Sequence, residues 1–227
     1  NAKDFIRQVR RETGLALEII APEEEARLAV ISCAPLVNPS TEQLLIVDIG
    51  GGSTELVWID LSAVAPADRP RAIMRLHMGF DAQGEGAVAR VVDWISVPLG
   101  VATLKDQFID VDDDAARFAL MSWFFEEHLS KFSPYNSENP REGFQIIGTS
   151  GTVTTVAASF LGLRRYDRTK VDGLEMSTTQ IDQVIREYLS LGPEGRRNDP
   201  RIGRDRQSLI MSGAAILQAL MRIWPTD

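Results

Sequence analysis

Three consecutive glycines between two apolar runs constrain this chain more than any other feature of its sequence. The first run, Leu44–Gly50, is LLIVDIG, and the chain leaves Gly51 and Gly52 through a second run, ELVWI. The pattern predicts a hairpin of two buried strands. Because glycine has no Cβ and tolerates positive φ, its backbone can approach a ligand closely, and successive N–H groups form a concavity for phosphate oxygens. A glycine turn that only reverses the chain is the alternative.

Polar side chains beside this turn add donors and carboxylates. Two hydroxyl residues follow the glycines, and hydroxyls donate hydrogen bonds to phosphate oxygens. Asp48 and Glu55 bracket the turn, and carboxylates beside phosphate suit Mg²⁺, a hard cation that bridges the two. The expected phosphate-binding residues of this turn are Gly50, Gly51, Gly52, Ser53 and Thr54.

A second loop repeats this chemistry about a hundred residues later. The apolar run Phe144–Ile147 ends in GTSGT, and a helical pattern follows it. Free N–H groups and the dipole at a helix N-terminus attract anions, although hydroxyl residues also cap helices for structural reasons alone. Neither loop fits the P-loop or the dinucleotide pattern. The expected phosphate contacts here are Gly148, Thr149, Ser150, Gly151 and Thr152.

Composition narrows the class of protein. The net charge of −8 argues against a nucleic-acid partner, which usually meets a basic surface. Cys33 is the only cysteine, so the chain has no intrachain disulfide, and a cytoplasmic location is the default expectation. Too few Cys and His residues are present for a zinc site. The most apolar segment, Ser208–Trp224, is short for a membrane span and predicts a buried helix; we expect no membrane partner.

Periodicity and turn residues predict the remaining elements. We expect Asp4 to cap the first helix and Gly14 to end it. Strands that come first and then alternate with helices are typical of an α/β layer architecture. Helical patterns cover residues 5–13, 22–34, 101–108, 115–132, 152–161, 177–191 and 208–224, and strand patterns cover 15–19, 44–50, 54–61, 71–79, 94–98 and 144–147.

Five arginines fall within eleven residues near the end of the sequence, in a segment rich in glycine and proline. A solvated loop is one interpretation of this cluster. A rim that faces an anion is the other, because guanidinium groups bind phosphate oxygens in pairs of hydrogen bonds. The five are Arg196, Arg197, Arg201, Arg204 and Arg206.

Four segments, in this order and spacing, resemble the exopolyphosphatase and guanosine pentaphosphate phosphohydrolase family (Ppx/GppA): GLALEIIAPEEEARLA, VDIGGGSTEL, SVPLG and IIGTSGTVTTVAA. The family belongs to the actin, Hsp70 and sugar-kinase superfamily, so the resemblance implies ribonuclease-H-like α/β domains around a cleft. It predicts that residues 42–227 form domain II, and that residues 1–34 are the end of domain I with the interdomain helix. The family's Asp-x-Gly-Ser-Asn-Ser loop, and most of domain I, have no counterpart here.

The resemblance implies release of the terminal phosphate from polyphosphate or guanosine pentaphosphate. Glu25 matches the acid believed to activate the attacking water, and Glu55 matches a second important acid. Asp48 matches a residue associated with the metal, so Asp48 and Glu55 are the expected Mg²⁺ ligands. Arg204 matches an arginine that precedes the family's last helix, which makes it a candidate phosphate contact.

Departures from the family pattern leave alternatives open. Thr103 replaces the family's usual arginine, and Asp172 replaces a frequent histidine. A module that binds nucleotide or phosphate without hydrolysis is therefore a second hypothesis. Because the resemblance implies that most of domain I is missing, we expect the fragment itself to be nearly inactive. The sequence does not decide whether the protein forms a homodimer.

Overall fold

A four-stranded sheet forms the centre of the computed structural model, which describes residues 2–76, 89–137 and 142–226. The strand order is β3-β2-β1-β4. β2 pairs antiparallel with both β1 and β3, whereas β4 runs parallel to β1. The strands are β1 (Gln43–Ile49), β2 (Thr54–Asp60), β3 (Arg90–Val97) and β4 (Phe144–Thr149).

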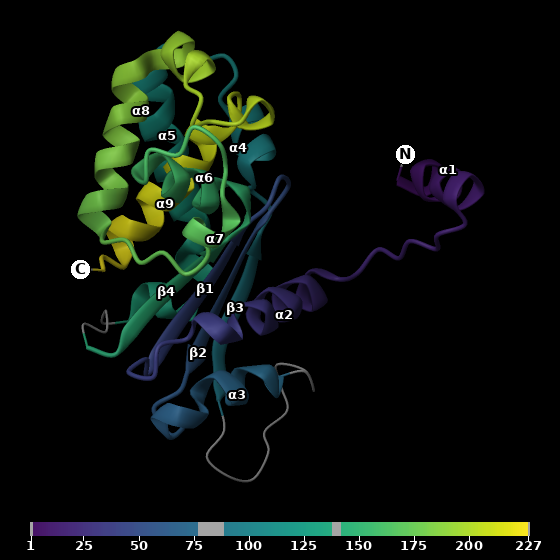
Figure 1. Cartoon of the computed structure of the whole chain (residues 1–227), viewed down its shortest axis with the longest axis vertical. Helices are drawn as coiled ribbons and strands as arrows, with labels where there is room; N and C mark the ends of the chain where they lie inside the picture. Colours follow the sequence, from purple (N-terminus) through teal and green to yellow (C-terminus); the bar gives the residue numbers. More distant parts are fainter. Residues whose placement is uncertain (1, 77–88, 138–141, 227) are drawn as a thin grey trace.

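Helices cover both faces of this sheet (Figure 1). One face carries α2 (Pro22–Cys33) and α3 (Arg69–Met74). The other face carries α4 (Val101–Gln107), α5 (Asp114–Glu127), α6 (Ser150–Phe160), α8 (Thr178–Asn198) and α9 (Ile210–Ile223). The short α7 (Arg168–Val171) lies near α6, and α1 (Ala2–Thr13) lies apart from the sheet at the end of an extended segment. No helix in the described parts of the chain is long and apolar enough to cross a membrane.

Alternate residues of β1 enter two separate cores. Leu45 and Val47 face α5, α6 and α9, whereas Leu44 and Ile46 face α2 and α3. A strand that is buried on both faces needs apolar residues at consecutive positions rather than at every second one. This requirement explains the continuous run LLIV and confirms the α/β layer architecture that the sequence predicts.

Most of the expected elements are present, and two strand predictions are wrong. Residues 15–19 form no strand: Leu15 and Ile19 are 60% and 73% exposed, and no described strand pairs with them. Residues 71–74 belong to α3 instead, because Pro70 occupies a first-turn position and Ile73 packs into the core. The end of that predicted strand, residues 77–79, lies outside the described residues. The division into domain I and domain II stays a prediction.

Helix termini follow the expected signals in part. Gly14 ends α1 with a φ of +77°. Ser177 caps α8 by accepting a hydrogen bond from the N–H of Gln180, as the sequence predicts. Asp4 lies inside the first turn of α1 rather than at its cap. The predicted helix 115–132 ends as an α-helix at Glu127 and continues as a 3-10 turn.

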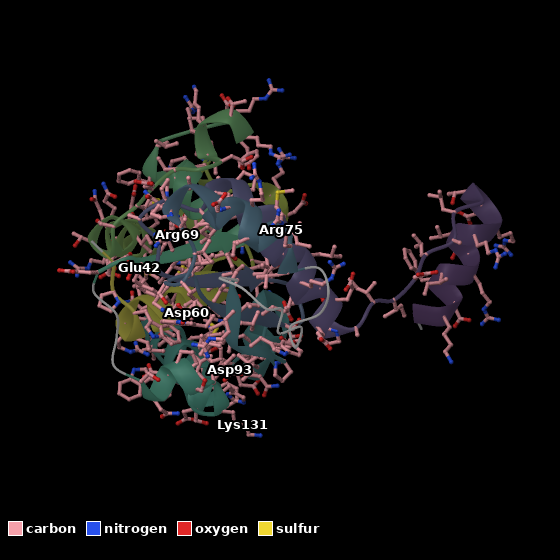
Figure 2. The ribbon with its side chains drawn as sticks, turned by 90° about the horizontal axis from the view of Figure 1, so that it is seen from below. Glu42, Asp60, Arg69, Arg75, Asp93 and Lys131 are labelled. Atoms are coloured by element: carbon pink, nitrogen blue, oxygen red, sulfur yellow. The ribbon has the colours of Figure 1, made fainter. Side chains whose placement is uncertain are left out.

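One edge of the sheet is held by a buried arginine, seen from below in Figure 2. Arg69 is 4% exposed and donates hydrogen bonds to the carbonyls of Val64 and Pro39. Its guanidinium also lies 3.9 Å from the carboxylate of Glu42. These bonds tie α3 to the loops around β1 and β2, at the edge opposite to α4 (Figure 1).

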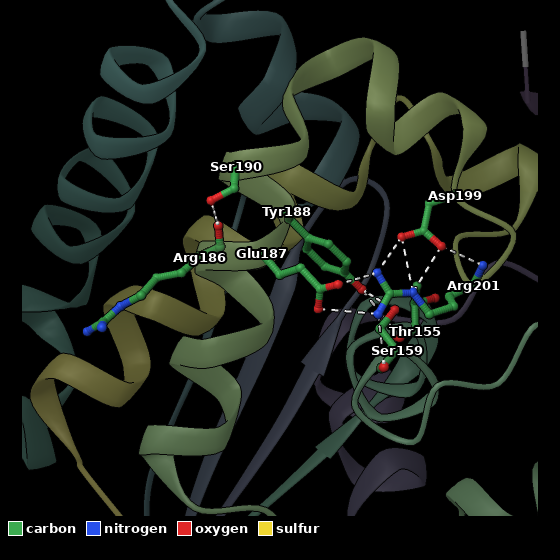
Figure 3. A network of polar contacts seen from close by, with 8 residues as sticks. All are labelled: Thr155, Ser159, Arg186, Glu187, Tyr188, Ser190, Asp199 and Arg201. Atoms are coloured by element: carbon green, nitrogen blue, oxygen red, sulfur yellow. Dashed lines mark hydrogen bonds and ion pairs between the residues drawn. The ribbon is translucent and has the colours of Figure 1, made fainter.

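Two arginines of the C-terminal cluster are structural, so neither interpretation of the cluster holds for them. Arg196 is buried, binds both carboxylate oxygens of Asp114 at 2.7 and 2.9 Å, and donates to the carbonyl of Tyr188. Arg201 binds the carboxylates of Asp199 and Glu187 (Figure 3). The sequence shows five cations, but it does not show which of them meet carboxylates from distant elements.

A polar network around Arg201 joins α8 to α6 (Figure 3). The hydroxyl of Tyr188 donates to Ser159 Oγ at 2.6 Å, and Arg201 Nη1 lies 3.5 Å from the Ser159 carbonyl. Burial raises the pKa of Tyr188 to about 12, so the phenol stays a neutral donor. The network fixes the C-terminal half of α6, whose N-terminus carries the GTSGT loop.

We expect Arg196→Met to lower the free energy of unfolding by about 1–3 kcal/mol, because it removes the bidentate partner of Asp114 and leaves only Arg117, at 3.4 Å, beside that carboxylate. Chemical denaturation measures this change. Arg197→Met is the matched control: Arg197 is exposed, and the expected change is within about 0.5 kcal/mol. Equal stability of the two variants would contradict a structural role for Arg196.

The same pair predicts how the stability depends on pH. Burial alone would raise the pKa of Asp114, but the hydrogen bonds and charge of Arg196, with a contribution from Arg117, hold it below its ordinary value. A lowered carboxyl pKa stabilises the fold above the unfolded value of about 3.9, and this contribution is lost as the pH falls through the folded pKa. The stability difference between the wild type and Arg196→Met should therefore shrink from pH 6 toward pH 3 in denaturation experiments. A constant difference over this range would contradict the assignment.

Candidate functional site

Parallel pairing of β1 with β4 brings the two predicted loops together. Val47 pairs with Gly148 and Asp48 pairs with Thr149, so both strands end at the same edge of the sheet. The hydroxyl of Thr149 lies 3.4 Å from the carbonyl oxygen of Val47, to which it donates. The carboxyl ends of parallel strands are the usual location of ligand sites in α/β folds. The structure thus joins loops that lie about a hundred residues apart in the sequence.

The glycine turn packs directly on the start of α4. The carbonyl of Gly50 accepts from Val101 N and that of Gly51 from Ala102 N, both at 2.9 Å. A side chain on Gly100 would overlap the backbone of Gly50 and Gly51, so this contact requires glycine at position 100. In the described part of the chain, the N–H groups of Gly51, Gly52 and Ser53 have no hydrogen-bond acceptor. These are the donors that a phosphate group needs.

The GTSGT loop turns into α6 through a strained residue. Ser150 has a φ of +74°, a left-handed conformation that is uncommon for residues other than glycine. Such conformations persist where the surrounding structure enforces them, and they cluster at functional sites. Among the residues that the structure describes, no side chain caps the N-terminus of α6, so its first N–H groups remain for a ligand.

The predicted hydroxyl contacts do not all face the site. Thr54 is fully buried and donates to the carbonyl of Leu99 at 2.8 Å. Thr152 is buried with its hydroxyl against Gly213 of α9, where there is no room for a further side chain. The hydroxyl of Thr54 therefore binds the backbone just before α4, and that of Thr152 packs against α9. The two loops therefore offer mainly backbone N–H groups as hydrogen-bond donors.

Three carboxylates from three elements converge beside the glycine turn. Glu55 on β2 is 2% exposed and accepts from Ser96 Oγ at 2.8 Å. Glu25 lies in the first turn of α2, and Asp48 lies on β1. Partial burial raises the pKa of Glu25, and the negative charges of Glu55 and Asp48 raise it further. A carboxylate with a raised pKa is a better proton acceptor near neutral pH.

The neighbours of Glu25 behave as ordinary helix acids. Glu24 binds Arg27 through both of its carboxylate oxygens, and these bonds lower the pKa of Glu24. Glu23 is exposed. Of the three consecutive acids, the electrostatics of the site involve Glu25, which agrees with the alignment on the family motif. The described residues contain no group of three or more His, Cys, Asp or Glu side chains able to hold a metal ion by themselves.

An arginine that the sequence offers only as one member of the C-terminal cluster lies against the GTSGT loop. The guanidinium of Arg206 occupies the space where a side chain on Gly151 would lie. The predicted contact, Arg204, is exposed two residues earlier in the same 3-10 turn. Both arginines belong to the segment GRDR. In the sequence, Arg204 differs from Arg206 only in its position before the last helix, which matches the family pattern. The structure places Arg206 at the N-terminus of α6, where a cation favours bound phosphate.

The two departures from the family pattern lie in different places. Asp172 caps α7 on the surface and pairs with Arg168 at 2.7 Å. Thr103 lies at the N-terminus of α4, and its hydroxyl contacts the glycine turn. The replacement of histidine by Asp172 therefore concerns a surface helix, whereas Thr103 belongs to the site.

Comparisons with known proteins agree with this geometry. The model of the Ppx/GppA phosphatase family matches residues 1–227. Exopolyphosphatase 1 of Mycobacterium leprae is 25% identical over 229 residues, a match that covers 98% of this chain and 57% of that protein. The crystal structure of the Aquifex aeolicus family member has 28% sequence identity and a TM-score of 0.70, covering all of this chain and 63% of that one. An exopolyphosphatase from Cytophaga hutchinsonii, at 19% identity and a TM-score of 0.73, shares the fold. The chain thus spans 57% and 63% of the lengths of the first two relatives.

We expect Gly100→Ala to lower the free energy of unfolding by about 1–3 kcal/mol, because the new methyl group would overlap the backbone of the glycine turn. Thermal or chemical denaturation measures the loss. Gly203→Ala is the control, since nothing lies within 4 Å of a Cβ there and its φ of −57° suits alanine. A Gly100→Ala protein as stable as this control would show that the turn does not depend on close packing against α4.

Proposed function

This chain belongs to the Ppx/GppA phosphatase family, and on this basis we propose that the protein containing it hydrolyses the terminal phosphoanhydride bond of inorganic polyphosphate. One observation carries the proposal: the glycine turn and the GTSGT loop, which both have N–H groups without an acceptor among the described residues, lie at the same end of the sheet as Glu25, whose pKa is raised. One end of the molecule thus combines donors for phosphate oxygens with a base for water. Relatives named exopolyphosphatase support hydrolysis over phosphate binding without turnover.

In the proposed reaction Glu25 accepts the proton of the attacking water. The water oxygen forms a bond to the terminal phosphorus, and the bond from that phosphorus to the bridging oxygen breaks. Orthophosphate leaves, and the shortened chain carries the electron pair of the broken bond on its new terminal oxygen. The N–H groups of Gly51, Gly52 and Ser53, with those at the start of α6, stabilise charge on the phosphoryl oxygens. Positioning and electrostatics of this kind dominate phosphoryl transfer.

We propose Mg²⁺ as the cofactor, with Asp48 and Glu55 as the residues that would hold it. The fit is reasonable because Mg²⁺ usually binds one or two carboxylates together with waters and substrate phosphates, rather than a full protein cage. Glu55 Oε1 accepts from Ser96, and within the described parts of the chain no hydrogen-bond donor meets its other oxygen. When bound, the ion would neutralise negative charge on the phosphate oxygens. It would also offset the repulsion between these two carboxylates and an anionic substrate.

Guanosine pentaphosphate is a second proposed substrate. It ends in the same phosphoanhydride group as polyphosphate, and the loop N–H groups recognise phosphate oxygens without regard to what lies beyond them.

We also propose a cytoplasmic location. Cys33 is a free, buried thiol, and burial raises its pKa to about 11, so the chain carries no reactive thiolate.

The test is made on the protein that contains this chain: it measures release of orthophosphate from polyphosphate in the presence of Mg²⁺, and its loss when the metal is chelated. We expect Glu25→Gln to lower kcat by about 10²–10⁴-fold, because glutamine cannot accept the proton of the attacking water. Glu23→Gln is the matched control on the same turn of α2 and should keep wild-type activity, since the carboxylates that converge beside the glycine turn are Glu25, Asp48 and Glu55. Full activity of Glu25→Gln would overturn the assignment of the base. Binding of polyphosphate by the wild type with no phosphate release would favour the alternative of a sensor.

A further inference from the structure

The third carbonyl of the glycine turn is held differently from the first two. The carbonyls of Gly50 and Gly51 accept backbone N–H groups of α4, whereas the carbonyl of Gly52 accepts from Thr103 Oγ1 at 3.0 Å. In the described residues no backbone N–H donates to the Gly52 carbonyl. The orientation of the peptide between Gly52 and Ser53 therefore depends on a single side chain.

Peptide geometry converts this bond into the direction of a donor. In a trans peptide the C=O and the following N–H point in opposite directions, and the described chain has no cis peptide bond. A Gly52 carbonyl that points toward α4 forces the N–H of Ser53 to point away from α4. The carbonyls of Gly50 and Gly51 impose the same direction on the N–H groups of Gly51 and Gly52. Three consecutive donors thus face the side opposite to the helix.

The hydroxyl of Thr103 is itself fixed from both sides. Thr103 Oγ1 accepts from the N–H of Gly100 at 2.8 Å, and its single proton has two acceptors within reach. The Gly52 carbonyl lies at 3.0 Å and the Gly100 carbonyl of the same helix at 3.3 Å, so the shorter bond goes to the turn. A hydroxyl that accepts one bond donates more strongly to the next. Two consecutive hydrogen bonds through Thr103 Oγ1 therefore connect the N-cap of α4 to the glycine turn.

We propose that Thr103 is a positioning residue, whose hydroxyl holds the Ser53 N–H toward the bound phosphate of the substrate. The inference rests on the proposed function, which supplies the phosphate. It assigns a role to a position at which this chain has threonine and the family usually has arginine. Thr103 acts through the Gly52–Ser53 peptide, and it makes no contact with the reacting atoms in this role.

The test compares Thr103→Val, which keeps the shape and loses the hydroxyl, with Thr103→Ser, which keeps the hydroxyl. The protein is labelled with ¹⁵N-glycine and ¹⁵N-serine and titrated with inorganic tripolyphosphate while the Gly51 and Ser53 amide signals are followed. We expect Thr103→Val to weaken tripolyphosphate binding about fivefold, as the loss of one hydrogen bond does. The response of Ser53 should fall, that of Gly51 should persist, and Thr103→Ser should restore both affinity and the Ser53 response.

Ser190→Ala is the control, because the hydroxyl of Ser190 donates to the Arg186 carbonyl of its own helix, away from the glycine turn; its titration should match that of the wild type. Equal responses of Ser53 in Thr103→Val and the wild type, or no response of Ser53 in the wild type, would overturn the proposal. If Thr103→Val does not fold, Thr103→Ala removes the same hydroxyl and is judged by the same criteria.

Activity measurements separate this inference from the function on which it rests. We expect kcat/KM for polyphosphate to fall about fivefold in Thr103→Val and to recover in Thr103→Ser. A wild type that binds tripolyphosphate through Ser53 but releases no phosphate from polyphosphate would contradict the proposed hydrolysis and leave the role of Thr103 supported. An active wild type whose Thr103→Val variant keeps its full kcat/KM would contradict the role of Thr103 alone.

Discussion

The close contact between the glycine turn and the start of α4 determines what this end of the molecule can bind. N–H groups at a helix N-terminus need acceptors, and here the carbonyls of the turn supply them. Each carbonyl used in this way directs the next N–H of the turn to the opposite side. The contact therefore satisfies the helix and exposes the donors of the turn at once. Gly100 is essential to it because the two backbones touch where its side chain would be.

Burial of the sheet on both faces places the carboxylates around that turn. Ala26 and Val30 of α2 are fully buried against the sheet, which fixes the rotation of the helix and puts Glu25 beside the ends of β1 and β2. Glu55 is held inside by Ser96 on the neighbouring strand. Partial burial raises the pKa of Glu25, the negative charges of Glu55 and Asp48 raise it further, and a raised pKa suits a proton acceptor. The same packing that stabilises the fold thus prepares Glu25 for its proposed role.

Features that depend on neighbouring residues in the sequence could be predicted, and those that depend on distant partners could not. The hairpin around the three glycines and the helix after GTSGT follow from local patterns, and both are present. The alternation at Leu15–Ile19 resembles a strand, yet a strand needs a partner, and none is found among the described residues. Arg206 and Arg196 look alike in the sequence, but the first lies on Gly151 and the second is buried against Asp114. The sequence also does not show that the hydroxyls of Thr54 and Thr152 contact Leu99 and α9 and point away from the site.

Both loops expose backbone N–H groups, but they are held in different ways, and only the GTSGT loop contains a strained residue. The glycine turn adopts its shape without a left-handed residue and is held from outside by α4. The GTSGT loop is held by its own helix and places Ser150 in a left-handed conformation, which costs on the order of 1–3 kcal/mol. That cost must be offset by the burial of α6 between β1, α8 and α9, where Val156 and Ala158 lie in the core. The network of Tyr188, Ser159 and Arg201 anchors the far end of the same helix. The strain at Ser150 is therefore sustained by the packing along the whole of α6, and this links the GTSGT loop to the stability of the fold.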